Sequence, residues 1–210
     1  MWQFILNFFH RRAGKFLREG GKIAPEKVAV EAVTMATAGG WKIHIDPEWR
    51  ELIGYDKMPQ AEQDRVLNEV ISSALVTVYA GLDETVPCLP GDRREFWRGV
   101  RDAFYPAYQS WQKENGIPDQ AIRDWQQLFD LRYEEYLQAQ SDTYEKFHLD
   151  LVALRSDDDR HATVQTMTIA AMTMLHVNRG QKFPNDLKSV RCLQKHLGYL
   201  VRENWHRFGW

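Results

Sequence analysis

Apolar side chains recur every three or four residues along most of this chain, and that spacing predicts α-helices. The pattern is strongest over residues 60–80 and continues longest over residues 118–154, with a predicted bend at Gln140 to Asp142 where polar residues enter the stripe. Glycine pairs and prolines separate these runs, as they do at helix ends. The sequence therefore predicts an all-α bundle of six or seven principal helices.

The stretch 161–177 is apolar nearly all round, which is typical of a helix at the centre of a bundle. It is about 15 residues long and contains four threonines, so it is too short and too polar to span a membrane. We expect it to be the central helix of the fold.

Residues 41–46 alternate between apolar and polar side chains, and segment 42–45 is the one place where an extended conformation is predicted. It follows a helix that opens at Pro25 and that Gly39 and Gly40 are expected to end. Asp46 before Pro47 reads as the N-cap of a short helix. His44, two residues earlier, is expected to be a surface group rather than half of an acid–base or metal pair.

The first 22 residues contain an amphipathic helix, 2–18, with an aromatic face and a basic face. Its apolar face needs a partner. We weigh three possibilities: the helix packs on its own domain, docks into a protein partner, or lies on a membrane surface. Packing on self or partner is preferred, because apolar helical stripes are most often buried in protein. The predicted interface residues are Trp2, Phe4, Ile5, Phe9, Arg11, Arg12 and Phe16.

The length of 210 residues suits a single helical domain, 23–210, with residues 1–22 as an arm or packed helix. A loop with two prolines is predicted over 81–91, and it is the expected place for a subdomain seam. Cys88 and Cys192 are far apart and match no metal spacing, so reduced thiols in a cytoplasmic protein are expected, with the membrane surface as an alternative location.

Charge is distributed unevenly. Residues 1–22 hold five basic side chains against one acidic, residues 182–210 hold six against two, and the middle holds 16 against 26. Ordinary solvated faces with balance inside the fold are the preferred explanation. The basic last helix carries no motif that reads nucleic acid, and the whole chain is slightly acidic, so nucleic acid is disfavoured as a partner.

Local catalytic or cofactor motifs are missing from the sequence. Two Glu-x-x-His pairs, Glu145/His148 and Glu203/His206, resemble those of di-metal helical bundles, but both pairs are predicted to point outward. Asp157 to Asp159 are expected to favour a helix N-terminus. The glycine pairs lack the context of a nucleotide-binding loop. We therefore predict no metal and no cofactor.

These patterns favour a non-enzymatic helical interaction or scaffold protein that binds a protein partner or associates with itself. Two alternatives stay open. One is a protein bound to the membrane surface through helix 2–18. The other is a helical enzyme or small-ligand binder whose pocket comes from distant helices, and its predicted polar groups are Tyr133, Tyr136, Tyr144, His148 and His176.

Overall fold

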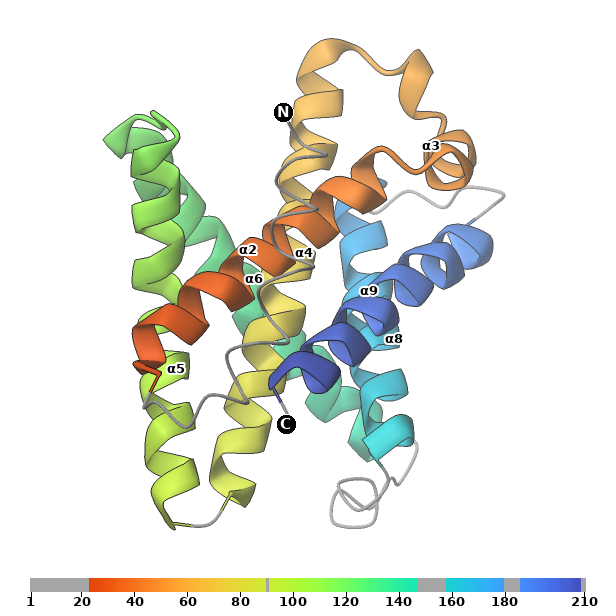
Figure 1. Ribbon diagram of the computed structural model, residues 1–210. Helices are drawn as coiled ribbons and strands as arrows, with labels where there is room; N and C mark the ends of the chain where they lie inside the picture. The colour runs from red at the N-terminus through yellow and green to blue at the C-terminus, as the bar shows by residue number, and fades with distance from the viewer. Residues whose placement is uncertain (1–22, 90, 147–157, 180–185, 209–210) are drawn as a thin grey trace.

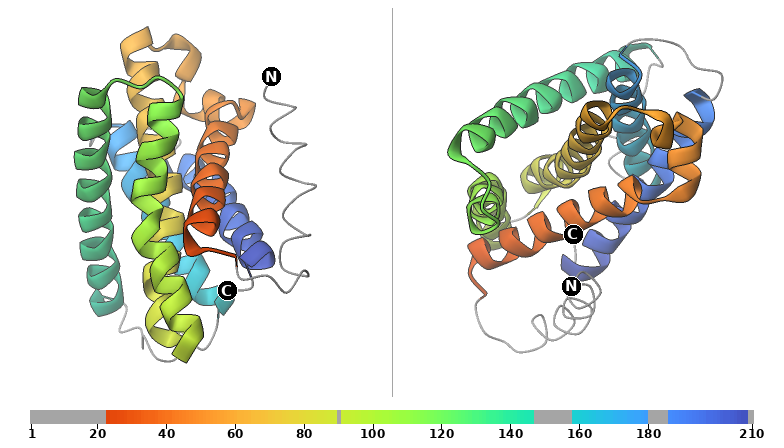
Figure 2. Two further views of the ribbon diagram at one scale, coloured as in Figure 1. Left: turned by 60° about the vertical axis from the view of Figure 1, so that its left-hand side comes forward. Right: turned by 90° about the horizontal axis from the view of Figure 1, so that it is seen from above.

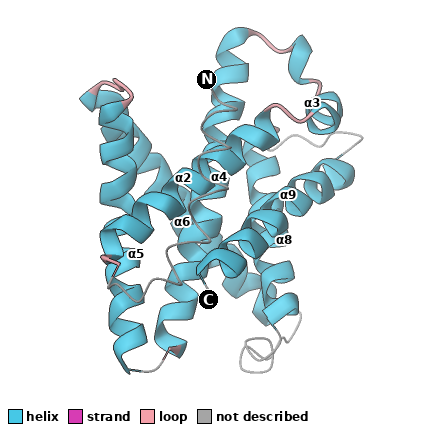
Figure 3. Cartoon of the chain, viewed as in Figure 1, coloured by secondary structure: helices cyan, strands magenta, loops and turns pink. Residues whose placement is uncertain are grey.

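The computed structural model describes residues 23–89, 91–146, 158–179 and 186–208. Within these ranges the chain forms seven α-helices and two short 3₁₀ turns, and no strand (Figures 1 and 3). The all-α prediction is therefore confirmed. The helices are α2 (Pro25–His44), α3 (Pro47–Ile53), α4 (Gln60–Thr85), α5 (Gly91–Glu114), α6 (Asp119–Lys146), α8 (Asp158–Val177) and α9 (Asp186–Phe208).

Helix α4 lies at the centre of the bundle. It contacts α2, α5, α6, α8 and α9, which surround it in the view from above (Figure 2). Helix α8, expected at the centre, packs against α4, α6 and α9 and is largely buried, but it leaves one side open. Its apolar character is therefore only partly used inside the bundle.

The extended segment expected near 42–45 is not formed, because α2 continues through Gly39 and Gly40 to His44. Both glycines serve packing rather than helix termination. A Cβ at Gly40 would lie 2.9 Å from Cα of Ile71 in α4, and one at Gly39 would lie 3.1 Å from Cδ1 of Leu200 in α9. Glycine therefore lets α2 cross α4 at close range, and small buried side chains such as Ala29, Ala32 and Ala36 continue that contact face.

Aromatic rings fill the opposite side of α4, where α5 and α6 pack. The Tyr79 ring of α4 lies 5.8 Å from Phe104, 5.4 Å from Phe129 and 4.9 Å from Tyr133, measured between ring centroids. The last two pairs are edge-to-face, an arrangement that aromatic rings favour. Helix α5 continues through Pro106 without a break.

Several helix ends follow the sequence signals. Asp46 caps α3 by accepting a hydrogen bond from the backbone N–H of Trp49 at 2.8 Å, as predicted. Gly54 and Gly116 adopt left-handed conformations after α3 and α5, with φ of 67° and 74°. Arg65 of α4 closes the last turn of α8 by donating to the carbonyl oxygens of His176 and Val177, both at 2.8 Å.

One helical segment in the described part of the chain, Gln60–Cys88, is long and apolar enough to cross a membrane on length and composition alone. Of its most apolar window, 67% is buried inside the bundle, and the core helix of a soluble protein passes the same test. Length and hydropathy therefore give only weak evidence for a membrane span here.

The close crossing of α2 and α4 generates a prediction about two neighbouring glycines. Gly40→Ala should lower the free energy of unfolding by up to about 2 kcal/mol, because overpacking costs about 1–3 kcal/mol and alanine gains only about 1 kcal/mol over glycine in a helix. Gly39→Ala is the matched control and should be close to neutral, because its new methyl group meets the movable end of Leu200. Urea denaturation measures both, and equal effects of the two substitutions would contradict the backbone contact.

Candidate functional site

The central helix carries two acidic side chains into the interior of the bundle. Glu69 is 7% exposed as a residue, and the side chain of Glu84 is 15% exposed. A buried carboxylate is costly unless it is paired and hydrogen-bonded. Glu69 meets a donor from α6, Glu84 meets donors from α6 and α8, and we call the resulting array the polar seam. Its members are Glu69 and Glu84 of α4, Arg132, Glu135, Tyr136 and Gln140 of α6, and His161, Gln165 and His176 of α8.

Glu84 is the hub at one end of the polar seam. Its carboxylate accepts hydrogen bonds from the Tyr136 hydroxyl at 2.8 Å and from the Gln140 and Gln165 amides at 2.6 and 3.3 Å. His161 Nε2 pairs with the second carboxylate oxygen. Burial raises the pKa of Glu84, but the hydrogen bonds and the charge of His161 outweigh it and hold the pKa below its usual range. The carboxylate form is therefore the stable one.

Two tyrosines of α6 complete this end of the polar seam. The Tyr136 hydroxyl is held against Glu84, and the Tyr133 hydroxyl donates to Asp83 at 2.7 Å. Burial, together with these neighbouring carboxylates, raises the pKa of both phenols. Each tyrosine is thus a fixed donor that keeps its proton at neutral pH.

Arg132 organises the other end. It donates two hydrogen bonds to Glu69, of 2.8 and 2.7 Å, and one to Glu135 at 2.9 Å. His176 Nε2 lies 2.8 Å from the same Glu135 oxygen. A forked guanidinium–carboxylate pair of this kind fixes orientation as well as charge. At this end the polar seam therefore ties α6 to α4 through Arg132 and α8 to α6 through His176, whereas at the Glu84 end both α6 and α8 bond to α4 directly.

Two small cavities lie along the polar seam. One, of about 30 Å³, is lined by Glu84, His161 and Asn204 among others, and the second, of about 20 Å³, lies beside Glu69 and Arg132. His161 Nδ1 and Asn204 Oδ1 are buried at the first cavity without a hydrogen-bond partner among the described residues. Cavities of this size hold about one or two water molecules, against about 300–1,000 Å³ for a small-molecule site.

A larger hollow of about 410 Å³ lies on the surface and is lined by residues of α3 and its flanking turns, among them Ile45, Arg50 and Asp56. It is an open depression with charged walls. It contains none of the residues of the polar seam, so the buried titratable groups and this larger hollow are in different places.

Four of the five residues predicted to line a pocket lie on or beside the polar seam, but not at one place. The Tyr136 hydroxyl bonds to Glu84, the Tyr133 hydroxyl bonds to Asp83, and Tyr144 contacts Gln140 at 3.2 Å, all at the Glu84 end, whereas His176 bonds to Glu135 at the other end. His148 is outside the described residues. Hydrogen-bonded side chains of α4 and α6, rather than an open pocket, meet these four residues.

The sequence interpretation missed the acidic partners of these tyrosines. Asp83 and Glu84 fall inside the 81–91 stretch that was interpreted as a loop, whereas α4 continues to Thr85. Leu82, which is buried, extends the apolar stripe of α4 and was the available signal. Gln140, predicted as a weak point of its helix, instead donates to Glu84, and α6 continues past it.

The position of His44 also differs from the prediction. It was expected at the surface, but it is 7% exposed and its Nε2 lies 3.2 Å from the Tyr55 hydroxyl. Because α2 stays helical to His44, the side chain turns inward beside Ile43 instead of alternating outward as in a strand. Burial and the nearby charge of Arg50 lower its pKa, so the neutral imidazole is favoured.

The remaining sequence candidates are placed only in part. Glu145 is exposed on α6, in line with the outward direction predicted for its pair, while His148 and the side chain of His206 are outside the described residues. The predicted N-terminal interface also lies outside them; it consists of Trp2, Phe4, Ile5, Phe9, Arg11, Arg12 and Phe16.

The outer side of α8 is an apolar face. Residues 161–178 contain no Asp, Glu, Lys or Arg. Three positions spaced four apart form an outward stripe, which we call the α8 stripe: Met167 is half-buried, Ala171 is exposed and Leu175 is 60% exposed. Water therefore meets a helix face with no charged side chain, which is unusual for the surface of a monomeric helical bundle.

Comparisons with known proteins do not identify a family for this chain. No protein-family model matches the chain, and neither a curated protein nor a solved structure matches it significantly. Inferences about function therefore rest on the residues themselves.

The pKa of Glu84 leads to a prediction about acid stability. Because the folded-state pKa is lowered, Glu84 contributes stability that is complete above its unfolded pKa of about 4.3 and is lost as the pH falls through the folded value. Glu84→Gln should reduce the unfolding free energy at pH 7 by about 1–3 kcal/mol, because a charged hydrogen-bond acceptor is lost. The variant should also lose less stability than the parent between pH 5 and pH 3, in urea denaturation at each pH.

Glu145→Gln is the matched control, since Glu145 is an exposed glutamate on the helix that faces Glu84. Its stability should follow that of the parent protein across the same pH range. A Glu84→Gln variant with the parent's full acid sensitivity would show that Glu84 is not a source of it.

Proposed function

We propose that this chain is a non-enzymatic helical interaction protein that associates with itself through an apolar helix face, and that the α8 stripe is that face. The observation that carries the proposal is the uncharged, solvent-facing side of α8. An apolar face of this kind is stabilised when it is covered, because burying apolar surface contributes about 25 cal/mol per Å². Among the described helices, α4, α6 and α9 pack against α8, and the α8 stripe stays half-buried to exposed.

A second copy of the chain is the partner that fits this face. Without charges, the α8 stripe requires no complementary charge on the surface it meets. Its order is large, small, large, and it is symmetrical about Ala171. A two-fold axis at Ala171 would bring two antiparallel α8 helices together at small side chains, with Met167 of each copy opposite Leu175 of the partner subunit.

The polar seam supports this proposal indirectly. Arg65 holds the last carbonyl groups of α8, and His161 and His176 tie its two ends to Glu84 and Glu135. The stripe between these ties is thus carried on a rigid helix, and a preformed surface loses less conformational entropy on association. Because one helix face buries less than the roughly 800 Å² per partner of a standard interface, we expect a weak dimer.

The two other functions considered for this chain have less support. The polar groups of the proposed pocket are bonded to one another, and the cavities between them hold water-sized volumes. Attachment to a membrane surface depends on residues 2–18, which are outside the described residues, and it stays a prediction.

Sedimentation velocity of the full chain over a range of concentrations tests the proposal. We expect a reversible monomer–dimer equilibrium that Leu175→Glu weakens at least about tenfold, because the substitution buries an unpaired carboxylate in the interface. The substitution should leave the fold intact, since Leu175 is exposed in the monomer.

Leu131→Glu is the matched control, because Leu131 is an exposed leucine on α6, 49% accessible and outside the α8 stripe. It should dimerise as the parent does. A parent chain that stays monomeric at several hundred micromolar, or a dimer that Leu175→Glu leaves unchanged, would overturn the proposal.

A further inference from the structure

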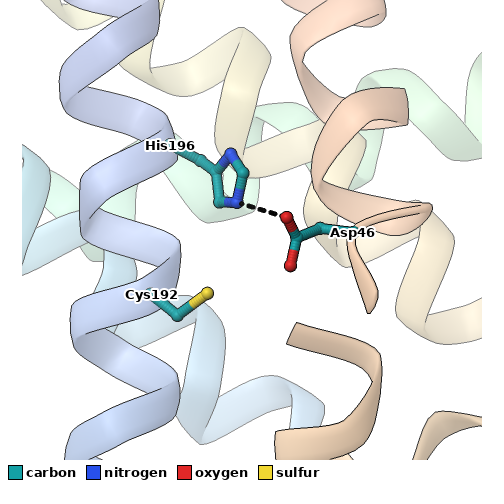
Figure 4. Close-up of side chains that lie close together, drawn as sticks. All are labelled: Asp46, Cys192 and His196. Atoms are coloured by element: carbon teal, nitrogen blue, oxygen red, sulfur yellow. Dashed lines mark ion pairs between the residues drawn. The ribbon is translucent and has the colours of Figure 1, made fainter. Parts of the chain in front are cut away.

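Three side chains with metal-binding atoms converge between α9 and the junction of α2 and α3 (Figure 4). Asp46 lies between the two helices and caps α3, while Cys192 and His196 are one turn apart on α9. Residues four apart share a helix face, so the thiol and the imidazole both point toward the Asp46 carboxylate. Cys192 Sγ, His196 Nε2 and a carboxylate oxygen of Asp46 all lie within 4.8 Å of one another.

We propose that Asp46, Cys192 and His196 form a binding site for a zinc-like divalent metal ion. Thiolate, imidazole and carboxylate are the three protein ligands that zinc takes, whereas calcium and magnesium prefer oxygen alone. Three protein ligands leave a fourth tetrahedral position for water or an exogenous ligand. The proposal adds a ligand class to the chain and is independent of the α8 stripe.

The spacing of the ligand atoms fits a tetrahedral ion. With metal–ligand bonds of about 2.0–2.3 Å, neighbouring ligand atoms of a tetrahedron lie about 3.3–3.7 Å apart. His196 Nε2 is 3.4 Å from Asp46 Oδ2, a separation longer than a good hydrogen bond and within that range. The upper limit of 4.8 Å for the set means that a small side-chain movement brings the sulfur into the same shell.

The residues around the three side chains orient them and leave the site accessible to an ion from solvent. The other oxygen of Asp46 accepts the 2.8 Å bond from the Trp49 N–H, which orients the carboxylate. The side chains of Asp46 and His196 are 26% and 27% exposed, so the site can be reached from solvent. The negative charges of Asp46 and Glu48 and the positive charge of Lys195 lie near Cys192. The charge around the thiol is therefore negative on balance, which favours a cation.

Cys192 has to lose its thiol proton before its sulfur can bind a metal ion. Burial, with the charges of Asp46 and Glu48, raises the pKa of its thiol to about 11. A metal ion therefore has to displace this proton, and its binding should strengthen as the pH rises. The other cysteine, Cys88, is exposed and donates to the backbone carbonyl of Glu84, and it provides an internal comparison.

A bound ion would link α9 to the start of α3 across a contact that is otherwise formed by side-chain packing and a long His196–Asp46 pair. Ligand binding to the folded state raises its stability with the logarithm of the ratio of ligand concentration to dissociation constant. The metal would therefore act as a tie between the last helix and the α2–α3 junction, with one coordination position left open.

Cobalt(II) titration of the full chain, stripped with a chelator beforehand, is the primary test. We expect one equivalent of cobalt to give the visible bands of a tetrahedral site and a near-ultraviolet thiolate-to-cobalt band, both displaced by zinc. Cys192→Ala should abolish the thiolate band. Asp46→Asn, which retains the capping oxygen, and His196→Gln should each weaken binding at least about tenfold.

Cys88→Ala is the matched control and should bind cobalt as the parent does. Circular dichroism of every metal-free variant checks that the fold is retained, and zinc should raise the melting temperature of the parent but not of Asp46→Asn. Absence of the thiolate band in the parent, or its loss in Cys88→Ala but not in Cys192→Ala, would overturn the site.

Discussion

Burial of two carboxylates on one helix determines how the helices around it are placed. Glu69 and Glu84 lie on the central helix, about four turns apart. Each needs donors that a neighbouring helix must bring, because an unpaired carboxylate in the interior costs several kcal/mol. Helix α6 supplies Arg132, Tyr136 and Gln140, and α8 supplies His161 and Gln165. A sliding movement of either helix would break several of these bonds together, so the polar groups specify one arrangement among the many that apolar packing alone would accept.

The two sides of α4 solve the packing problem in different ways. Toward α2, glycine and alanine allow the backbones to approach closely, and toward α5 and α6, aromatic rings fill a wider space. Between these two sides, the hydrogen bonds of the polar seam fix the positions of α6 and α8 relative to α4. The outer side of α8 has none of these partners, which is why its exposed leucine and alanine stand out against the rest of the surface.

The sequence predicts the helices of this protein far better than it predicts their neighbours. Asp46 and Pro47 locate the start of α3 correctly, because these signals act within a few residues. Gly39 and Gly40 were wrongly predicted to end α2. In a single sequence, a glycine that ends a helix cannot be distinguished from a glycine that lets another helix approach closely. The partners of Glu84 could not be predicted from the sequence either, since His161 is 77 residues away in the chain. The Asp46, Cys192 and His196 group likewise required knowledge of how α9 crosses the α2–α3 junction.

The long sequence separation within the polar seam also bears on the order of folding. Arg65 reaches the end of α8 across 111 residues, and Glu84 reaches its start across 77. Contacts this distant form only after a large loss of chain entropy, so local helices are expected to appear first. While a ribosome has yet to release α8, Glu84 has its donors from α6 but no histidine or glutamine from α8, so its carboxylate stays partly hydrated. Helices α2 to α6 should therefore reach their final arrangement only after α8 emerges, which makes the emergence of α8, rather than local helix formation, the step that commits this bundle to its native state.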